Sequence, residues 1–277
     1  MEQRTFSAMG TTIELLVEAE DVEQKFDEAA AELERLEQVM SRFRPTSELS
    51  RLNRDGAITA SQDLAEVVEL ALAARERTNG AFDPTVHDAL VGAGYDRTFA
   101  EVAPDNPAAA EPGRCGGGVS LDGRRITLEP GYRLDLGGIG KGFAAERVAQ
   151  LLSLTGPCLV SAGGDVAVRG VPAAGTWSIG VDDTLTLGLD RGGLATSGRD
   201  TRRWRRDGAE LHHLIDPTTG RPAVTDLVRV TAIGEDAVDA EVLAKTLFLR
   251  GSSAAVAADA PAVLVLDDGR TIRTGGL

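Results

Sequence analysis

Apolar residues recur at helical spacing in two segments of the first 80 residues. In the segment DVEQKFDEAAAELERLEQVMSRF (21–43) they fall on one side of a helix: Phe26, Ala30, Leu33, Leu36, Met40 and Phe43. The segment SQDLAEVVELALAARERTNG (61–80) has a similar period, begins with Ser61 as a helix N-cap and ends at Gly80. Two amphipathic helices are therefore predicted.

Most of the remaining chain favours short strands. Thr11–Glu20 alternates weakly, and RRITL, CLVS, DVAVRG, WSIGV and TLGLD follow one another between residues 119 and 195, interrupted by one helix after Gly142. LHHLI, LVRVTAIG and PAVLVLD are further strand candidates, with a helix expected at 236–250. The Pro-, Ala- and Gly-rich segment 103–118 is typical of a surface loop. Blocks of helices and strands, rather than strict alternation, indicate an α+β fold, and we treat 1–277 as a single domain.

Composition restricts the class of function. The 43 acidic and 29 basic residues give a net charge of −14, which disfavours nucleic-acid partners and anionic membranes. The two cysteines, Cys115 and Cys158, form no CxxC motif, so neither a disulfide framework nor a zinc site is indicated. The sequence has no signal-peptide pattern and no apolar run of about 18 residues, so we expect no membrane insertion and a cytoplasmic protein.

One glycine-rich loop is the first candidate for ligand binding. RLDLGGIGKGFAAERV (133–148) combines a strand-like RLDL, several glycines, Lys141 and a helix start. GGIGKG matches neither the Walker A spacing nor the dinucleotide-binding GxGxxG pattern. Its glycines allow backbone amides to approach a ligand, and Lys141 adds a positive charge. From the loop alone, an ordinary glycine-rich turn with a solvated lysine is as good an interpretation.

Other segments are weak in isolation but specific in combination. GAFDPTV, SAGGDVAVRG, ATSG and HLIDPTTGRP each read as a common turn. In chain order, eight segments resemble the signature motifs of the ApbE family: AMGTT (8–12), SRFRPTSELSRLN (41–53), GAFDPTV (80–86), LDLGGIGKGFAAERV (134–148), SAGGDVAVRG (161–170), ATSG (195–198), HLIDPTTGRP (213–222) and EVLAKTLF (241–248).

The resemblance implies both a fold and an activity. The expected fold is α+β, with two related halves built of mixed, largely antiparallel sheets and flanking helices around a central FAD site. The expected activity is transfer of FMN from FAD to a Thr or Ser hydroxyl of an acceptor protein, with release of AMP. Two alternatives stay open: hydrolysis of FAD to FMN and AMP, and FAD binding without turnover.

The resemblance also assigns site residues. The implied FAD contacts are Met9, Phe43, Ala81, Phe82, Asp83, Asp135, Lys141 and Ile215. Phe43 stands where the family usually has a Tyr that stacks on the flavin, so the ring face is kept and the hydroxyl is lost. For catalysis, Lys141 is expected to neutralise phosphate charge and His213 to accept the proton of the acceptor hydroxyl. The alternative for His213 is a strand histidine hydrogen-bonded to Asp216.

The metal motif departs from the family pattern. The family typically has DxxxT, whose Asp and Thr hold Mg²⁺ together with a backbone carbonyl, here that of Gly138, whereas this chain has Glu241 and Lys245. Glu241 can replace Asp, but the Lys245 ammonium repels a divalent ion. Lys245 is expected either to turn to solvent or pair with Glu241 at i,i+4, or to take the place of the cation, which gives metal-independent or weakened catalysis.

Overall fold

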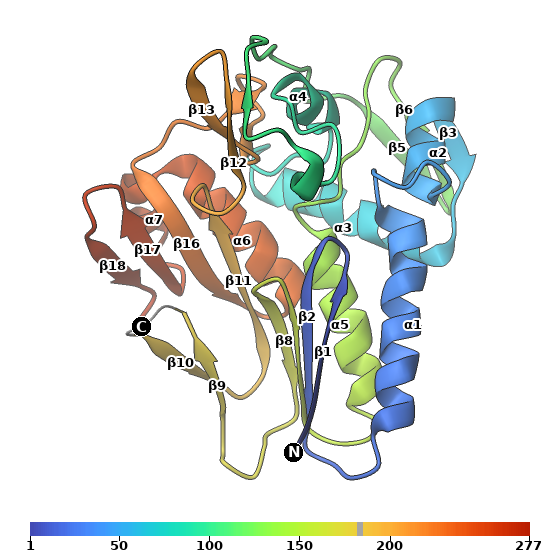
Figure 1. The fold of residues 1–277 in the computed structure, drawn as a ribbon, viewed down its shortest axis with the longest axis vertical. Helices are drawn as coiled ribbons and strands as arrows, with labels where there is room; N and C mark the ends of the chain where they lie inside the picture. The colour runs from blue at the N-terminus through green and yellow to red at the C-terminus, as the bar shows by residue number, and fades with distance from the viewer. Residues whose placement is uncertain (182–184) are drawn as a thin grey trace.

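The computed structural model describes residues 1–181 and 185–277, and its centre is an eight-stranded antiparallel sheet (Figure 1). Across the sheet the strands are ordered β1 (Glu2–Ala8), β2 (Thr11–Val17), β7 (Cys158–Ala162), β8 (Asp165–Arg169), β11 (Gly192–Gly198), β16 (Leu227–Gly234), β17 (Ala262–Leu266) and β18 (Thr271–Thr274). Side chains alternate between the two faces: Val160 of β7 packs into the main core, while its neighbour Leu159 packs on the opposite face.

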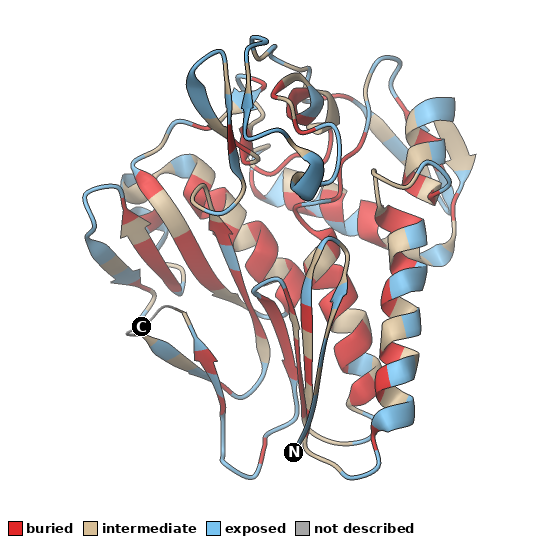
Figure 2. Ribbon diagram, in the orientation of Figure 1, coloured by how far each residue is buried: buried red, intermediate tan, exposed pale blue. Residues whose placement is uncertain are grey.

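Two helices cover one face of this sheet. Helix α5 (Gly140–Leu152) packs on β7 and β8, helix α6 (Ala237–Arg250) packs on β11 and β16, and the two helices contact each other. Their buried sides are continuous with the buried positions of the strands (Figure 2). The opposite face is partly covered by the hairpin of β9 (Trp177–Gly180) and β10 (Thr186–Leu189).

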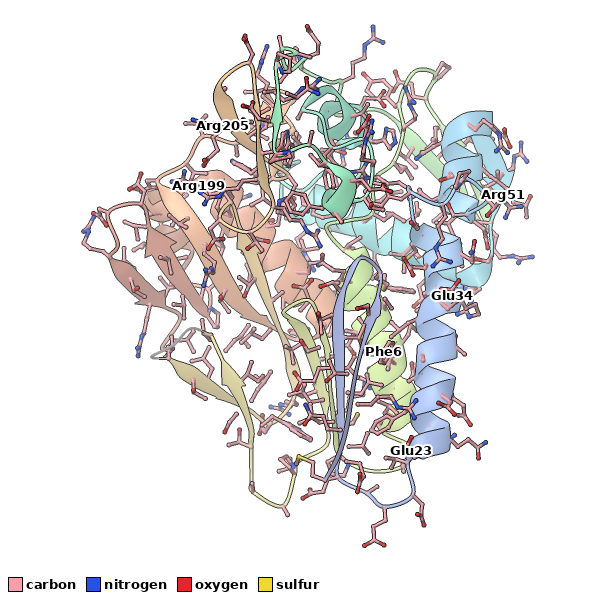
Figure 3. All side chains as sticks on the ribbon, in the orientation of Figure 1. Phe6, Glu23, Glu34, Arg51, Arg199 and Arg205 are labelled. Carbon is pink, nitrogen blue, oxygen red and sulfur yellow. The ribbon has the colours of Figure 1, made fainter. Side chains whose placement is uncertain are left out.

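Helix α1 (Glu23–Met40) flanks α5 and carries the predicted amphipathic pattern. Its large apolar residues are buried in the main core, Ala30 is only half-buried, and Glu23 and Glu34 are exposed on its outer side (Figure 3). Phe43 of the predicted pattern lies beyond the end of the helix. Helix α3 (Gln62–Arg77) begins as predicted, since the Ser61 side chain accepts a hydrogen bond from the Leu64 amide. The remaining helices are α2 (Glu48–Asp55), α4 (His87–Gly92), α7 (Ser252–Ala258) and the 3₁₀ helix η1 (Phe99–Glu101).

Smaller sheets surround the end of the central sheet where the cavities described below open. One contains β3 (Ala57–Thr59), β6 (Arg125–Leu128) and β5 (Val119–Asp122); a second contains β13 (Ala209–His212), β12 (Arg203–Arg206) and β4 (Asp105–Asn106); a third pairs β14 (Ile215–Asp216) with β15 (Arg221–Pro222). Trp204 of β12 packs against α4, and its indole nitrogen donates to the Ala93 carbonyl at 2.8 Å. None of the described helices is long and apolar enough to cross a bilayer.

The α+β prediction is confirmed, and two local expectations are wrong. The RLDL segment belongs to no strand, because Asn53 and Pro84 rather than a neighbouring strand satisfy its backbone. LHHLI is not one strand, since β13 ends at His212 and β14 begins at Ile215. The relation between two halves of the fold stays a prediction.

Candidate functional site

Two neighbouring cavities lie at the end of the sheet near the β1–β2 turn. The first, of about 270 Å³, is largely apolar, and it is lined by residues that include Met9, Met40, Phe43, Phe82, Leu90 and Tyr95. The second, of about 310 Å³, has a mainly polar lining that includes Thr196, Ser197 and Asp200. The residues that line both cavities are Gly10, Phe99, Gly137, Lys141, Arg202, His213 and Lys245. The site therefore joins an apolar compartment to one rich in polar groups.

The turn between β1 and β2 brings Met9 to the apolar cavity. Ala8 pairs with Thr11, so Met9 and Gly10 form a two-residue hairpin turn with φ of 53° and 67°. A positive φ suits Gly10 but is strained for Met9. The turn thus places the flexible thioether side chain of Met9 at the cavity wall, although the Met9 backbone has a conformation that few residues other than glycine adopt.

The Asp135 loop is held by contacts from distant parts of the chain. The Asn53 side chain bonds both the amide (2.7 Å) and the carbonyl (2.8 Å) of Leu134, and the Asp135 amide donates to the Pro84 carbonyl at 2.8 Å. One oxygen of Asp135 accepts from the Gly137 amide at 2.8 Å. These bonds fix the glycine-rich loop in the turn that leads into α5.

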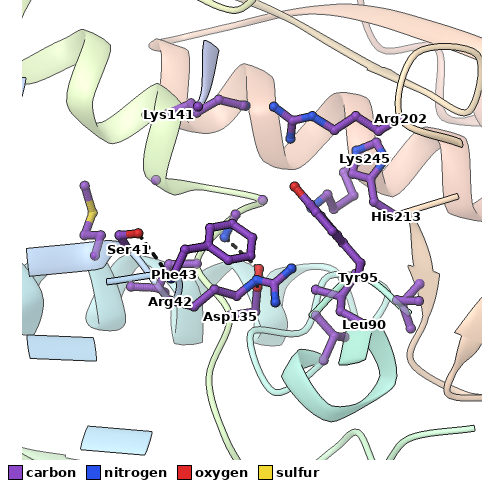
Figure 4. A pocket seen from close by; sticks show the side chains of 18 of the residues that line it. Ser41, Arg42, Phe43, Leu90, Tyr95, Asp135, Lys141, Arg202, His213 and Lys245 are labelled. Carbon is purple, nitrogen blue, oxygen red and sulfur yellow. Dashed lines mark hydrogen bonds and ion pairs between the residues drawn. The ribbon is translucent and has the colours of Figure 1, made fainter. Parts of the chain in front are cut away.

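Arg42 connects this loop to the aromatic wall of the apolar cavity (Figure 4). Its Nε lies 2.6 Å from the second oxygen of Asp135, and both side chains are only 7% exposed. Its guanidinium carbon lies 4.1 Å from the ring centre of Phe43 and 4.5 Å from that of Tyr95. A guanidinium between two rings favours cation–π attraction and orients both rings toward the cavity.

The AFD segment (81–83) forms part of the wall of the apolar cavity. Ala81, Phe82 and Asp83 all line it. The Asp83 carboxylate accepts hydrogen bonds at 2.8 Å from the Thr85 amide and hydroxyl and from the Gly116 amide. Asp83 therefore stabilises the loop that carries Phe82.

At the polar cavity, Lys141 lies between two buried carboxylates. Its ammonium contacts Asp165 and lies 2.8 Å from one oxygen of Glu241, whose other oxygen accepts from the Gly142 amide at 2.9 Å. Burial disfavours the charged lysine, but Asp165 and Glu241 outweigh this effect and raise its pKa. Burial also raises the pKa of Asp165 to about 6, although Lys141 opposes it.

His213 faces both cavities from the break between β13 and β14. Among the described residues its buried Nδ1 has no hydrogen-bond partner, and Asp216 instead accepts from Thr218. Burial, followed by the charges of Arg202 and Lys245, holds the pKa of His213 well below its usual value. The neighbouring His212 has a structural role, because its ring bonds the Ala223 carbonyl and the Leu214 amide.

Lys245 is partly buried and reaches toward the glycine-rich loop. A Cβ atom on Gly138 would collide with its ammonium. Within residues 1–181 and 185–277 it forms no ion pair within 4.0 Å, and Glu241 pairs with Lys141 instead. Burial lowers the pKa of Lys245, although Glu241 and then Asp135 oppose this.

These contacts do not fit a bound Mg²⁺. Both oxygens of Glu241 are already engaged, by Lys141 and Gly142, and the Lys245 ammonium is next to Gly138. Among the described residues, no three His, Cys, Asp or Glu side chains are grouped so that they could hold a metal ion. An ammonium group at this position repels a divalent cation and supplies no ligand.

Residues 9–263 match the sequence profile of the ApbE family. The chain belongs to the ApbE family. It is 30% identical over 298 residues to a Treponema pallidum protein named FAD:protein FMN transferase, in an alignment that covers 94% of this chain and 82% of that protein. A Vibrio cholerae protein of the same name is 30% identical over 261 residues, covering 86% of this chain and 78% of the relative.

Solved structures of ApbE proteins have the same fold. A crystal structure of an ApbE protein from Thermotoga maritima superposes with a TM-score of 0.88 at 25% identity, covering 99% of this chain and 97% of that one. The flavin transferase ApbE from Vibrio cholerae superposes with a TM-score of 0.76 at 26% identity, with the same coverage. The α+β architecture is therefore that of ApbE flavin transferases.

The structure of this ApbE chain brings the residues assigned from its motifs to one place. All eight expected FAD contacts line the apolar cavity, and Glu241 lines the polar one. Sequence reasoning missed Arg42, Tyr95 and Arg202, and it assigned no role to Asp165. Only Arg42 and Asp165 carried a signal, because they lie inside the motifs SRFRPTSE and SAGGDV.

Proposed function

We propose that this chain is an FAD:protein FMN transferase, which attaches FMN from FAD to a Thr or Ser hydroxyl of an acceptor protein and releases AMP. The observation that carries the proposal is the junction of the two cavities, where Lys141 and His213 face both an apolar compartment and a polar one. Such a junction can hold the flavin on one side and admit an acceptor hydroxyl on the other. The names of the ApbE relatives support the same activity.

The apolar cavity suits the isoalloxazine ring. Met9, Phe43 and Phe82 offer polarisable and aromatic surface, and Ile215 adds an aliphatic contact. The Arg42 guanidinium lies against the Phe43 ring, so we infer that a stacked flavin contacts this pair rather than Phe43 alone. These residues bind and orient the flavin end of FAD, and they exclude water from it.

The proposed chemistry is one displacement at the FMN phosphorus. The oxygen of the acceptor hydroxyl forms the new P–O bond, and the P–O bond to AMP breaks. His213 takes the hydroxyl proton, which the lowered pKa of this imidazole permits, because the ring is neutral near pH 7. Lys141 stabilises the negative charge that remains on the phosphates. AMP leaves with the electron pair of the broken bond.

One experiment separates this function from its alternatives. Purified protein is incubated with FAD and an acceptor domain that contains a candidate Thr, and both the nucleotides and the acceptor mass are measured. An acceptor that gains one FMN, together with AMP, supports the transferase, whereas free FMN and AMP without acceptor labelling support FAD hydrolysis. Intact FAD under all conditions supports a flavin-binding protein without turnover. The expected cytoplasmic location stays a prediction, which fractionation of the native cells can test.

A further inference from the structure

Three side-chain cations surround the junction of the two cavities. Lys141, Arg202 and Lys245 line both compartments, and the charged ends of Lys141 and Arg202 face each other from opposite sides of the site (Figure 4). Lys141 is paired with Asp165 and Glu241, but within the described part of the chain neither Arg202 nor Lys245 has a carboxylate partner within 4.0 Å. In a protein of net charge −14, two unpaired cations at one cavity junction require an explanation.

The buried carboxylates of the polar cavity, Asp165 and Glu241, do not pair with Arg202 or Lys245, because both bind Lys141. Glu241 is only 4% exposed, and its two oxygens are bonded to Lys141 and Gly142. Arg202 and Lys245 therefore face the cavity as free donors, and a bound polyanion is the ligand that such donors select. In FAD the pyrophosphate is joined to the isoalloxazine ring through the ribityl chain, so a flavin in the apolar cavity can extend its anionic group to the two cations at the junction.

We propose that Lys245 and Arg202 hold the FAD pyrophosphate directly and that this chain transfers FMN without a divalent cation. The proposal rests on the transferase function proposed above. As the acceptor oxygen bonds to phosphorus, His213 takes its proton and the bond to AMP breaks. The charge that gathers on the AMP phosphate then lies beside two fixed cations, where a low local dielectric strengthens the attraction.

The test measures FAD binding apart from turnover. Flavin fluorescence titrations are made in EDTA and in Mg²⁺ for the unmodified protein, for Lys245→Met, and for Lys25→Met, a control at a half-buried lysine of α1 that lines neither cavity. We expect the unmodified protein and Lys25→Met to bind FAD equally in both buffers, and Lys245→Met to bind about 10- to 100-fold more weakly in both. Lys245→Arg, which keeps the charge, should recover most of the affinity. Loss of binding by the unmodified protein in EDTA, or equal affinities for the two Met variants, would overturn the proposal.

Turnover then separates failure of this proposal from failure of the function itself. AMP release with acceptor labelling should persist in EDTA, and Lys245→Thr, which removes the ammonium and adds a hydroxyl, should lose activity unless Mg²⁺ is added. Transfer that requires Mg²⁺ in the unmodified protein contradicts the metal-independent step and leaves the transferase function intact. The protein could instead release no AMP in either buffer and still bind FAD in EDTA in a way that depends on Lys245. That result rejects the transfer step and the transferase function. It supports only direct recognition of the pyrophosphate.

Discussion

Replacement of Asp165 by Asn should change how stability depends on pH. Asp165 is 2% exposed and shares the Lys141 ammonium with Glu241, so the buried site holds two carboxylates for one cation. Burial raises the pKa of Asp165 to about 6, from about 3.9 in an unfolded chain. Because one pKa unit corresponds to about 1.4 kcal/mol, ionising Asp165 in the folded state costs about 3 kcal/mol.

The direction of this effect follows from the raised pKa. A carboxyl group of raised pKa stabilises the fold fully below its unfolded pKa, and that stabilisation is lost as the pH rises through the folded pKa. Relative to the unmodified protein, Asp165→Asn should therefore gain up to about 3 kcal/mol in free energy of unfolding between pH 4 and pH 7. Most of the gain should fall between about pH 4 and pH 6.

Urea unfolding followed by circular dichroism at several pH values measures this difference. Subtracting the two curves removes the contribution of the carboxylates that lie away from Asp165. Asp55→Asn is the matched control, since the hydrogen bond from Arg54 lowers the pKa of this exposed carboxylate. Its difference curve should be small and of opposite sign. A flat or falling curve for Asp165→Asn would refute the raised pKa that burial gives this carboxyl group.

Three further predictions follow from the site. His213→Gln should slow FMN transfer about 100- to 10,000-fold, because the general base is lost, and should leave the FAD affinity unchanged. In the unmodified protein, kcat/KM should stay constant as the pH falls to about 6.5, because the pKa of His213 is lowered. A decrease in kcat/KM that begins above about pH 6.5 would contradict the lowered pKa. Arg42→Met leaves the buried Asp135 without its ion-pair partner, so the free energy of unfolding in urea should fall by about 3–5 kcal/mol. Adding Asp135→Asn should recover part of this loss. No recovery in the double variant would exclude the ion pair as the cause. Met9→Gly relieves a positive φ that costs about 1–2 kcal/mol, but the new glycine adds an unfolded-chain entropy cost of about 0.4–1 kcal/mol. The apo protein should therefore be stabilised by no more than about 1 kcal/mol, while FAD binding should weaken. Stability and affinity that fall together would refute this trade-off.

Much of the local structure could be predicted because it depends on neighbours in the chain. The pattern of 21–43 became α1, Ser61 capped α3, and the 236–250 pattern became α6, since helical periodicity records which side of a segment is buried. The RLDL segment shows the limit of such reasoning. Its apolar residues resemble a strand, but its backbone partners are the Asn53 side chain and the Pro84 carbonyl, which no local pattern encodes.

The sequence by itself determined the family, the order of the motifs and the residue types available for the chemistry, including Lys245 where the resemblance leads us to expect a threonine. Only the tertiary structure decided how those residues pair. Glu241 is 100 residues from Lys141 in sequence and binds it, although Lys245, four residues from Glu241 on the same helix, was the local candidate. The physical reason is that a buried carboxylate needs a nearby cation, and the packing of α5 on α6 brings Lys141 next to Glu241. The same packing leaves Lys245 facing the cavity.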